Sequence, residues 1–73
     1  MEVGRKYRIT TPTIALVIEG GHRVAYTVPS GAIIVVEGEA EEDGGNFINV
    51  RWSGREAMMF AQDLQSRGNL IKD

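Results

Sequence analysis

The sequence predicts an all-β domain, a small and strongly bent barrel of five to six short antiparallel strands with one short helical turn near the C-terminus. Three observations favour this class. Apolar residues alternate with polar ones in short runs, turns rich in glycine separate these runs, and a helical spacing of four appears only from Phe60 onward. The chain has 73 residues, so we expect one domain that spans residues 1–73.

Three strands are predicted before residue 29. Residues 6–10 form the first, and Pro12 ends it because proline cannot donate to a ladder of hydrogen bonds. Residues 13–18 are β-branched and aliphatic, which is typical of a strand, and residues 23–28 return. Between them Gly20 and Gly21 suit the positive φ angles of a tight hairpin.

The second half of the chain continues this pattern. Residues 29–31 form a break, residues 32–39 a strand, and residues 41–46 a turn. Residues 47–52 and 55–59 are two strands joined by a two-residue loop at Ser53 and Gly54. About two turns of helix follow Phe60, with Gly68 as the C-cap glycine and Asp63 paired with Arg67 or close to the helix start. Residues 70–71 are a candidate final strand.

Counting outward from the loop at residues 53–54 predicts which side chains of the last hairpin share a face. The core face has Arg55 at its rim, stacked on an indole, and it carries Ile48, Val50, Trp52, Ala57 and Met59. The other face opposes Arg51 to Glu56, Asn49 to Met58, and Phe47 to Phe60. It therefore begins in solvent and becomes apolar towards the two phenylalanines.

Phe47, Met58 and Phe60 are the candidate interaction surface. Two alternatives would cover them: the helix at residues 62–67, or a second subunit. Residues 32–36 pose the same question, because five consecutive apolar residues need cover on both faces of a strand. Either a strongly bent strand contributes each half to a different side, or one face meets a partner.

Self-association is expected on energetic grounds. A single core in so short a chain rarely supplies more than about 3–5 kcal/mol, and disulfides, metals or oligomerisation are the usual additions. The sequence has no cysteine and one histidine, so disulfides and multi-histidine zinc sites are excluded. Covering about 600–800 Å² per subunit suffices for a stable dimer. We expect a homodimer, or a complex with another protein.

The order of the predicted elements resembles that of SH3-like barrels: a long early hairpin, a central strand, a tight hairpin, a short helical turn and a last strand. The segments "TVPSGAIIVV" and "VRWSGREAMMFAQDLQSRG" also look like parts of a group of short uncharacterised bacterial proteins. This resemblance implies an SH3-like fold and a bacterial source, and it carries no activity.

No catalytic arrangement is predicted. His22 follows two glycines in an exposed turn, and the acidic stretch from Glu37 to Asp43 implies no pocket and lacks the spacing of a calcium loop. In size and in "FAQDL" the chain resembles the type II plasmid-borne dihydrofolate reductases, SH3-like chains with an active site in a pore shared between subunits. Their pore-lining Val-Gln-Ile-Tyr strand corresponds to residues 57–60, where glutamine and tyrosine are absent. We therefore expect no enzyme, no cofactor and no metal.

The sequence thus predicts a non-enzymatic protein-interaction or assembly module. The alternative is nucleic-acid binding, with Tyr7 or Trp52 as a stacking surface and contacts from Arg5, Lys6, Arg8, Arg51 and Arg55. A net charge of −2 does not favour it. A small-ligand or catalytic site between subunits is a third alternative. No apolar run is long enough to span a bilayer, and we expect a cytoplasmic protein.

Overall fold

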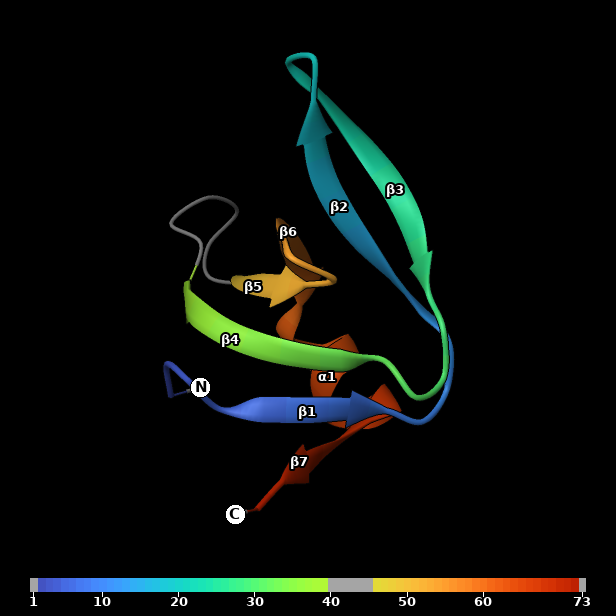
Figure 1. Cartoon of the computed structure of the whole chain (residues 1–73), viewed down its shortest axis with the longest axis vertical. Helices are drawn as coiled ribbons and strands as arrows, with labels where there is room; N and C mark the ends of the chain where they lie inside the picture. The colour runs from blue at the N-terminus through green and yellow to red at the C-terminus, as the bar shows by residue number, and fades with distance from the viewer. Residues whose placement is uncertain (1, 40–45, 73) are drawn as a thin grey trace.

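A computed structural model describes residues 2–39 and 46–72. In these ranges the chain forms seven strands and one short helix (Figure 1). The elements are β1 (Lys6–Ile9), β2 (Thr13–Glu19), β3 (His22–Val28), β4 (Ile33–Glu39), β5 (Phe47–Trp52), β6 (Arg55–Phe60), α1 (Ala61–Arg67) and β7 (Gly68–Ile71). The predicted all-β class with one short helix near the C-terminus is confirmed, although the strands number seven and not five or six.

The strands form one sheet in the order β3-β2-β6-β5-β4-β1-β7, and every neighbouring pair is antiparallel. Figure 1 shows the sheet bent sharply, so that the β2–β3 hairpin rises away from β4, β1 and β7. Along the chain, β1 is followed by the long hairpin β2–β3, the central strand β4, the tight hairpin β5–β6, the helix α1 and the last strand β7. Within the described residues β3 and β7 are the two edges of the sheet.

Both predicted tight hairpins form with the predicted loops. Gly20 and Gly21 have φ angles of 58° and 80°, and the strands pair from Glu19 opposite His22 onward. Ser53 and Gly54 have φ angles of 54° and 77°. Positive φ at both central residues matches the right-handed twist of the flanking strands. The predicted turn at residues 41–46 lies outside the described residues except for Asn46, which precedes β5.

The register counted across the β5–β6 hairpin is confirmed at all six pairs, from Trp52 opposite Arg55 to Phe47 opposite Phe60. The predicted core face is correspondingly buried, with Trp52 half-buried and packed against it. The contiguous core cluster consists of Ile9, Ala15, Val17, Val28, Ile34, Val36, Ile48, Val50, Ala57, Met59 and Leu64.

Strand β4 divides its apolar run between two environments. Ile34 and Val36 are buried in the core, while Ile33 is 38% exposed and Val35 is half-buried on the opposite face. A shift in the β4–β5 register follows between Val36 and Gly38. The run is thus divided by alternate residues and not by the two halves of the strand, and contact of its outer face with a partner stays a prediction.

Helix α1 contributes Leu64 to the core and contacts β1, β6 and β7. Gly68 is the C-cap residue of α1, as predicted, but it is extended (φ −139°, ψ 162°) and begins β7, whereas a C-cap glycine usually adopts the left-handed conformation. Glycine is needed there for space. A Cβ atom at Gly68 would lie 2.9 Å from the carbonyl oxygen of Leu64 and 3.3 Å from that of Arg8. No helix in residues 2–39 and 46–72 is both long and apolar enough to cross a membrane.

We predict that Gly68→Ala destabilises the fold, because the added methyl group meets two backbone oxygens that cannot move independently. Overpacking of this kind costs about 1–3 kcal/mol. Urea unfolding measures the loss, with the exposed Ser66→Ala on α1 as a control that changes stability by less than about 0.5 kcal/mol. Equal unfolding curves for the two variants would contradict the steric explanation.

Candidate interaction surface

The outer side of β2 and β6 carries a continuous apolar surface. Leu16 lies directly opposite Met58, so these two side chains share a face. Ile14 and Ile18 flank Leu16 at a spacing of two and point the same way, as does Phe60 beside Met58. We call this surface the β2–β6 face and define it by Ile14, Leu16, Ile18, Met58 and Phe60.

Three of these side chains are largely open to solvent. The exposed fraction is 53% for Ile14, 58% for Ile18 and 46% for Phe60, and Leu16 and Met58 are half-buried between them. The alternate residues of β2, which are Thr13, Ala15 and Val17, are buried. An exposed cluster of large apolar side chains on a sheet face marks a site of interaction more often than isolated surface residues do.

Phe47 supports this face and does not contribute to its surface. It is only 8% exposed, and its ring stacks on that of Phe60 with a centroid separation of 4.4 Å and an interplanar angle of 29°. It also lies outside the contiguous core cluster. Of the three predicted surface residues, Phe60 is therefore exposed, Met58 is at the centre of the face, and Phe47 lies beneath Phe60.

Helix α1 does not cover the β2–β6 face. Its buried residue, Leu64, packs into the core, and Phe60 immediately before the helix remains exposed. Open depressions of about 730 Å³ and 260 Å³ border the face at Phe60 and at Ile14, and Asp63 lines both. The β2–β6 face is thus bordered by two depressions that side chains of a partner can enter.

Asp63 and Arg67 both bind the start of β2 and not each other. The Thr13 hydroxyl donates a hydrogen bond to Asp63 Oδ2 at 3.3 Å, and Arg67 Nη1 donates to the carbonyl oxygen of Pro12 at 3.0 Å. These contacts take the place of the first predicted alternative, an Asp63–Arg67 pair, and the second is confirmed, because Asp63 lies in the first turn of α1. The two hydrogen bonds join α1 to the chain that enters β2.

Sequence reasoning missed the β2 half of the face. Its signal was the run Ile14 to Ile18, five apolar residues that need cover on both sides of a strand, as in residues 32–36. Assigning Ile14 and Ile18 to the same surface as Phe60 requires knowing that β2 lies beside β6. The two strands are distant in sequence, and no turn joins them.

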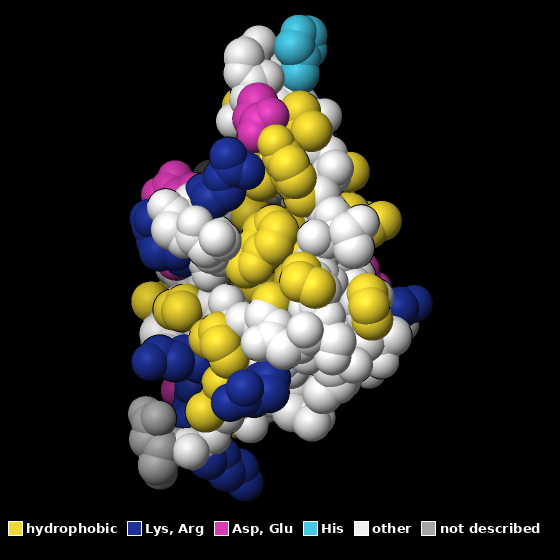
Figure 2. Space-filling model, turned by 45° about the vertical axis from the view of Figure 1, so that its right-hand side comes forward, with side chains coloured by type: hydrophobic (Ala, Val, Ile, Leu, Met, Phe, Trp, Pro, Cys, Tyr) yellow, Lys and Arg dark blue, Asp and Glu magenta, His cyan; other side chains and the backbone are white. Residues whose placement is uncertain are grey.

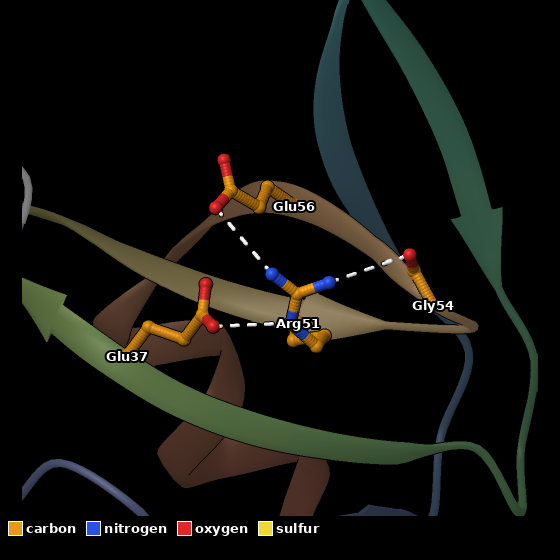
Figure 3. A network of polar contacts seen from close by, with 4 residues as sticks. All are labelled: Glu37, Arg51, Gly54 and Glu56. Atoms are coloured by element: carbon orange, nitrogen blue, oxygen red, sulfur yellow. Dashed lines mark hydrogen bonds and ion pairs between the residues drawn. The ribbon is translucent and has the colours of Figure 1, made fainter.

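The predicted nucleic-acid contacts are not brought together as one basic surface. Arg5 binds Glu2, with Nε 3.0 Å from the carboxylate. Arg51 is held by three groups (Figure 3): Nε lies 3.1 Å from Glu37, Nη2 lies 3.4 Å from Glu56, and Nη1 donates to the carbonyl oxygen of Gly54 at 3.4 Å. Two carboxylates therefore offset the charge of this arginine.

Arg55 lies over a different ring from the one predicted. Its guanidinium is 5.2 Å from the ring centroid of Tyr26 and 3.5 Å from Glu19, whose carboxylate also accepts a hydrogen bond from the Tyr26 hydroxyl. The predicted stacking on Trp52 is wrong, because the β2–β3 hairpin brings Tyr26 and Glu19 within reach of the β5–β6 loop. The long hairpin and the short one are thereby joined.

Lys6 and Arg8 lie on the outer face of β1, opposite Val35 and Ile33 of β4. Arg51 shares this face because it pairs with Val35. In Figure 2, below the hairpin tip that carries histidine, Lys and Arg side chains flank hydrophobic ones in the lower part of the molecule. The structure thus places three of the five predicted cations on one face, and one of those three is bound by acidic side chains.

Two acidic residues of the stretch from Glu37 to Asp43 are described, and the rest lie outside the described residues. Glu37 binds Arg51, as shown above. Among the residues that the structure describes, no three His, Cys, Asp or Glu side chains form a group that could hold a metal ion.

Comparisons of this chain with protein-family models, curated proteins and solved structures found no match.

The two phenylalanines are predicted to differ in their contribution to stability. Phe47→Ala should lower the free energy of unfolding by about 3–5 kcal/mol, the usual cost of removing a buried phenylalanine. Phe60→Ala should cost less than half of that, because its ring already contacts water. Urea unfolding of the two variants and the parent protein compares their free energies of unfolding, at a chain concentration low enough that each protein is a monomer. Equal losses would mean that Phe60 belongs to the core.

Proposed function

We propose that this protein is a non-enzymatic interaction module that forms a homodimer through the β2–β6 face. One observation carries the proposal: Ile14, Ile18 and Phe60 are each about half exposed on adjacent strands of one sheet. Contact with another apolar surface removes these side chains from water and lowers the free energy by about 25 cal/mol for each Å² that is buried.

A second copy suits this face because a twofold contact joins a surface to itself. The centre of the face is uncharged, so its apolar residues can meet their own counterparts without opposing like charges. Charges of both signs border it near Ile18, with Arg23 on β3 and Glu56 on β6. Because the rim carries both positive and negative side chains, two identical surfaces do not repel each other there as two surfaces of one charge sign would.

The required area is available on so small a molecule. A standard interface covers about 800 Å² on each partner. The accessible surface of the chain is 4619 Å², so such a contact would cover roughly a sixth of it. A homodimer would also supplement the limited core expected of a chain of this length.

Nucleic-acid binding has less support. Three of the five cations proposed for that role, Arg5, Arg51 and Arg55, lie within 3.5 Å of a carboxylate oxygen. Binding phosphate would require each to exchange an existing ion pair for a new one, so the net gain is small. Lys6 and Arg8 remain, and two cations make a weak phosphate-binding surface.

We predict that Ile14→Glu abolishes the dimer and that Ile33→Glu does not. Both substitutions place a carboxylate at an exposed isoleucine on a strand, but only Ile14 belongs to the β2–β6 face. Light scattering at micromolar chain concentration should show about twice the 8.0 kDa chain mass for the parent protein and Ile33→Glu, and 8.0 kDa for Ile14→Glu.

Circular dichroism and urea unfolding check that both variants remain folded, and Ile18→Glu serves as a second variant of the same face. A parent protein that stays at the mass of one chain at high concentration would overturn the proposal. So would a dimer that survives charges at both Ile14 and Ile18.

A further inference from the structure

Strand β3 is an open edge of the sheet. It occupies one end of the strand order, and each of its seven residues pairs with β2 in an unbroken register. Figure 1 shows it along the outer margin of the hairpin. In the described part of the chain, no strand lies on its other side. Such an edge is a template for an additional antiparallel strand.

The hairpin geometry shows which backbone groups of β3 point outward. A two-residue loop is closed by a hydrogen-bonded pair, here Glu19 and His22. Hydrogen-bonded and non-hydrogen-bonded pairs then alternate along an antiparallel ladder. Val24, Tyr26 and Val28 therefore bond to β2, while Ala25 and Thr27 direct their N–H and C=O groups to the open edge. Neither of these two takes part in the backbone hydrogen bonds formed outside the ladders among the described residues.

This edge has little of the usual protection against pairing, with Arg23 as the charged side chain among its outward positions 23, 25 and 27. Short length, proline, bulges and lysine normally block an exposed strand. The opposite edge, β7, has four residues and is followed by Lys72. In contrast, β3 has seven residues without a proline or a register shift, and the side chains at Ala25 and Thr27 are small and uncharged.

We infer that β3 pairs antiparallel with β3 of a second copy about a twofold axis at Ala25. The inference rests on the proposed self-association and names a second contact, which each chain makes with a further copy and not with the copy on its β2–β6 face. Ala25 is the midpoint of His22–Val28, so this centre pairs all seven residues, and any other centre shortens the ladder. It places Val24 opposite Tyr26 of the other copy on both sides of the axis.

The side chains are compatible with this register. A β-branched residue opposite an aromatic one is a favourable pair across strands, and the Tyr26 ring is already positioned by Glu19 and Arg55. Arg23 falls opposite Thr27 and not opposite itself, so like charges do not meet directly. Alanine at the axis leaves room for the two strands to approach.

The edge contact and the β2–β6 face do not compete. Ala25 and Thr27 are paired with Leu16 and Ile14, so their side chains lie on the same side of the sheet as that face. A twofold axis perpendicular to the sheet joins two sheets edge to edge and places both β2–β6 faces on one surface. The edge buries fewer large apolar side chains, so we expect it to form at higher chain concentration than the face contact.

A covalent trap tests the edge contact. Hydrogen-bonded partners have Cα atoms about 5.5 Å apart, within the range that a disulfide spans. The chain has no cysteine, so Ala25→Cys introduces a single thiol. With oxidised glutathione at high protein concentration, Ala25→Cys should form a covalent dimer much faster than Ser66→Cys, an exposed control on α1 that reports random collision.

A matched pair of second substitutions identifies the strand pairing itself. Adding Thr27→Pro removes an outward N–H and leaves the β2 ladder intact, so the excess cross-linking of Ala25→Cys should be lost. Adding Thr27→Val retains the N–H and should retain the cross-link. Circular dichroism confirms that both double variants are folded. A cross-link that survives Thr27→Pro, or a rate equal to that of Ser66→Cys, overturns the inference.

The same trap in the Ile14→Glu background separates this inference from the proposed function. Cross-linking that persists there and remains sensitive to Thr27→Pro shows that the edge pairs without the face. A protein that is dimeric by light scattering but cross-links at Ala25 no faster than the control retains the face contact and lacks the edge contact. A monomer that still cross-links through Ala25 has the edge contact alone.

Discussion

The two-residue turn at Ser53 and Gly54 determines which side chains of β5 and β6 face the core. A slip of one residue in this register would exchange the two sides, moving Met59 and Val50 outward and Met58 and Phe60 inward. Positive φ at both turn residues holds the register, and the β5–β6 pairs keep it for the length of both strands. The apolar outer face thus follows from the same constraint that builds the core.

The polar contacts join elements that the turns alone leave independent. Arg55 of the short hairpin forms an ion pair with Glu19 and lies over the ring of Tyr26. The Thr13 hydroxyl at the start of β2 donates a hydrogen bond to Asp63. Each pair is partly exposed, so its contribution to stability is small, about 0–1 kcal/mol for an ion pair at the surface. Their effect is geometric. These contacts hold neighbouring elements of the fold together and pair Arg55 with a carboxylate. The apolar side chains of the β2–β6 face, in contrast, remain exposed to water among the described residues.

Two features of the sheet remain unmatched among the residues that the structure describes: an apolar face on β2 and β6, and an open edge at β3. They differ physically, because the face gains mainly from removing hydrocarbon from water and the edge mainly from completing backbone hydrogen bonds. Lying on the same part of the sheet, they allow one partner type to satisfy both. A chain with a small core has most to gain from such contacts.

The sequence by itself determined the local features of this protein. Gly20, Gly21, Ser53 and Gly54 specify tight loops, and alternation of apolar residues specifies strands, because both depend on a few neighbouring residues. The hairpin register could be counted for the same reason, and it placed Met58 and Phe60 on the outer side correctly.

Tertiary structure decided the rest. The neighbour of β2 across the sheet is β6, which no turn connects to it, so Ile14 and Ile18 join Phe60 only through the bend of the whole sheet. The same bend brings Arg55 to Tyr26 and the end of α1 against β1, where only a glycine fits at position 68. Contacts between residues distant in the chain depend on how the sheet curves. That curvature is set by the summed packing of the core and is not encoded in any one segment.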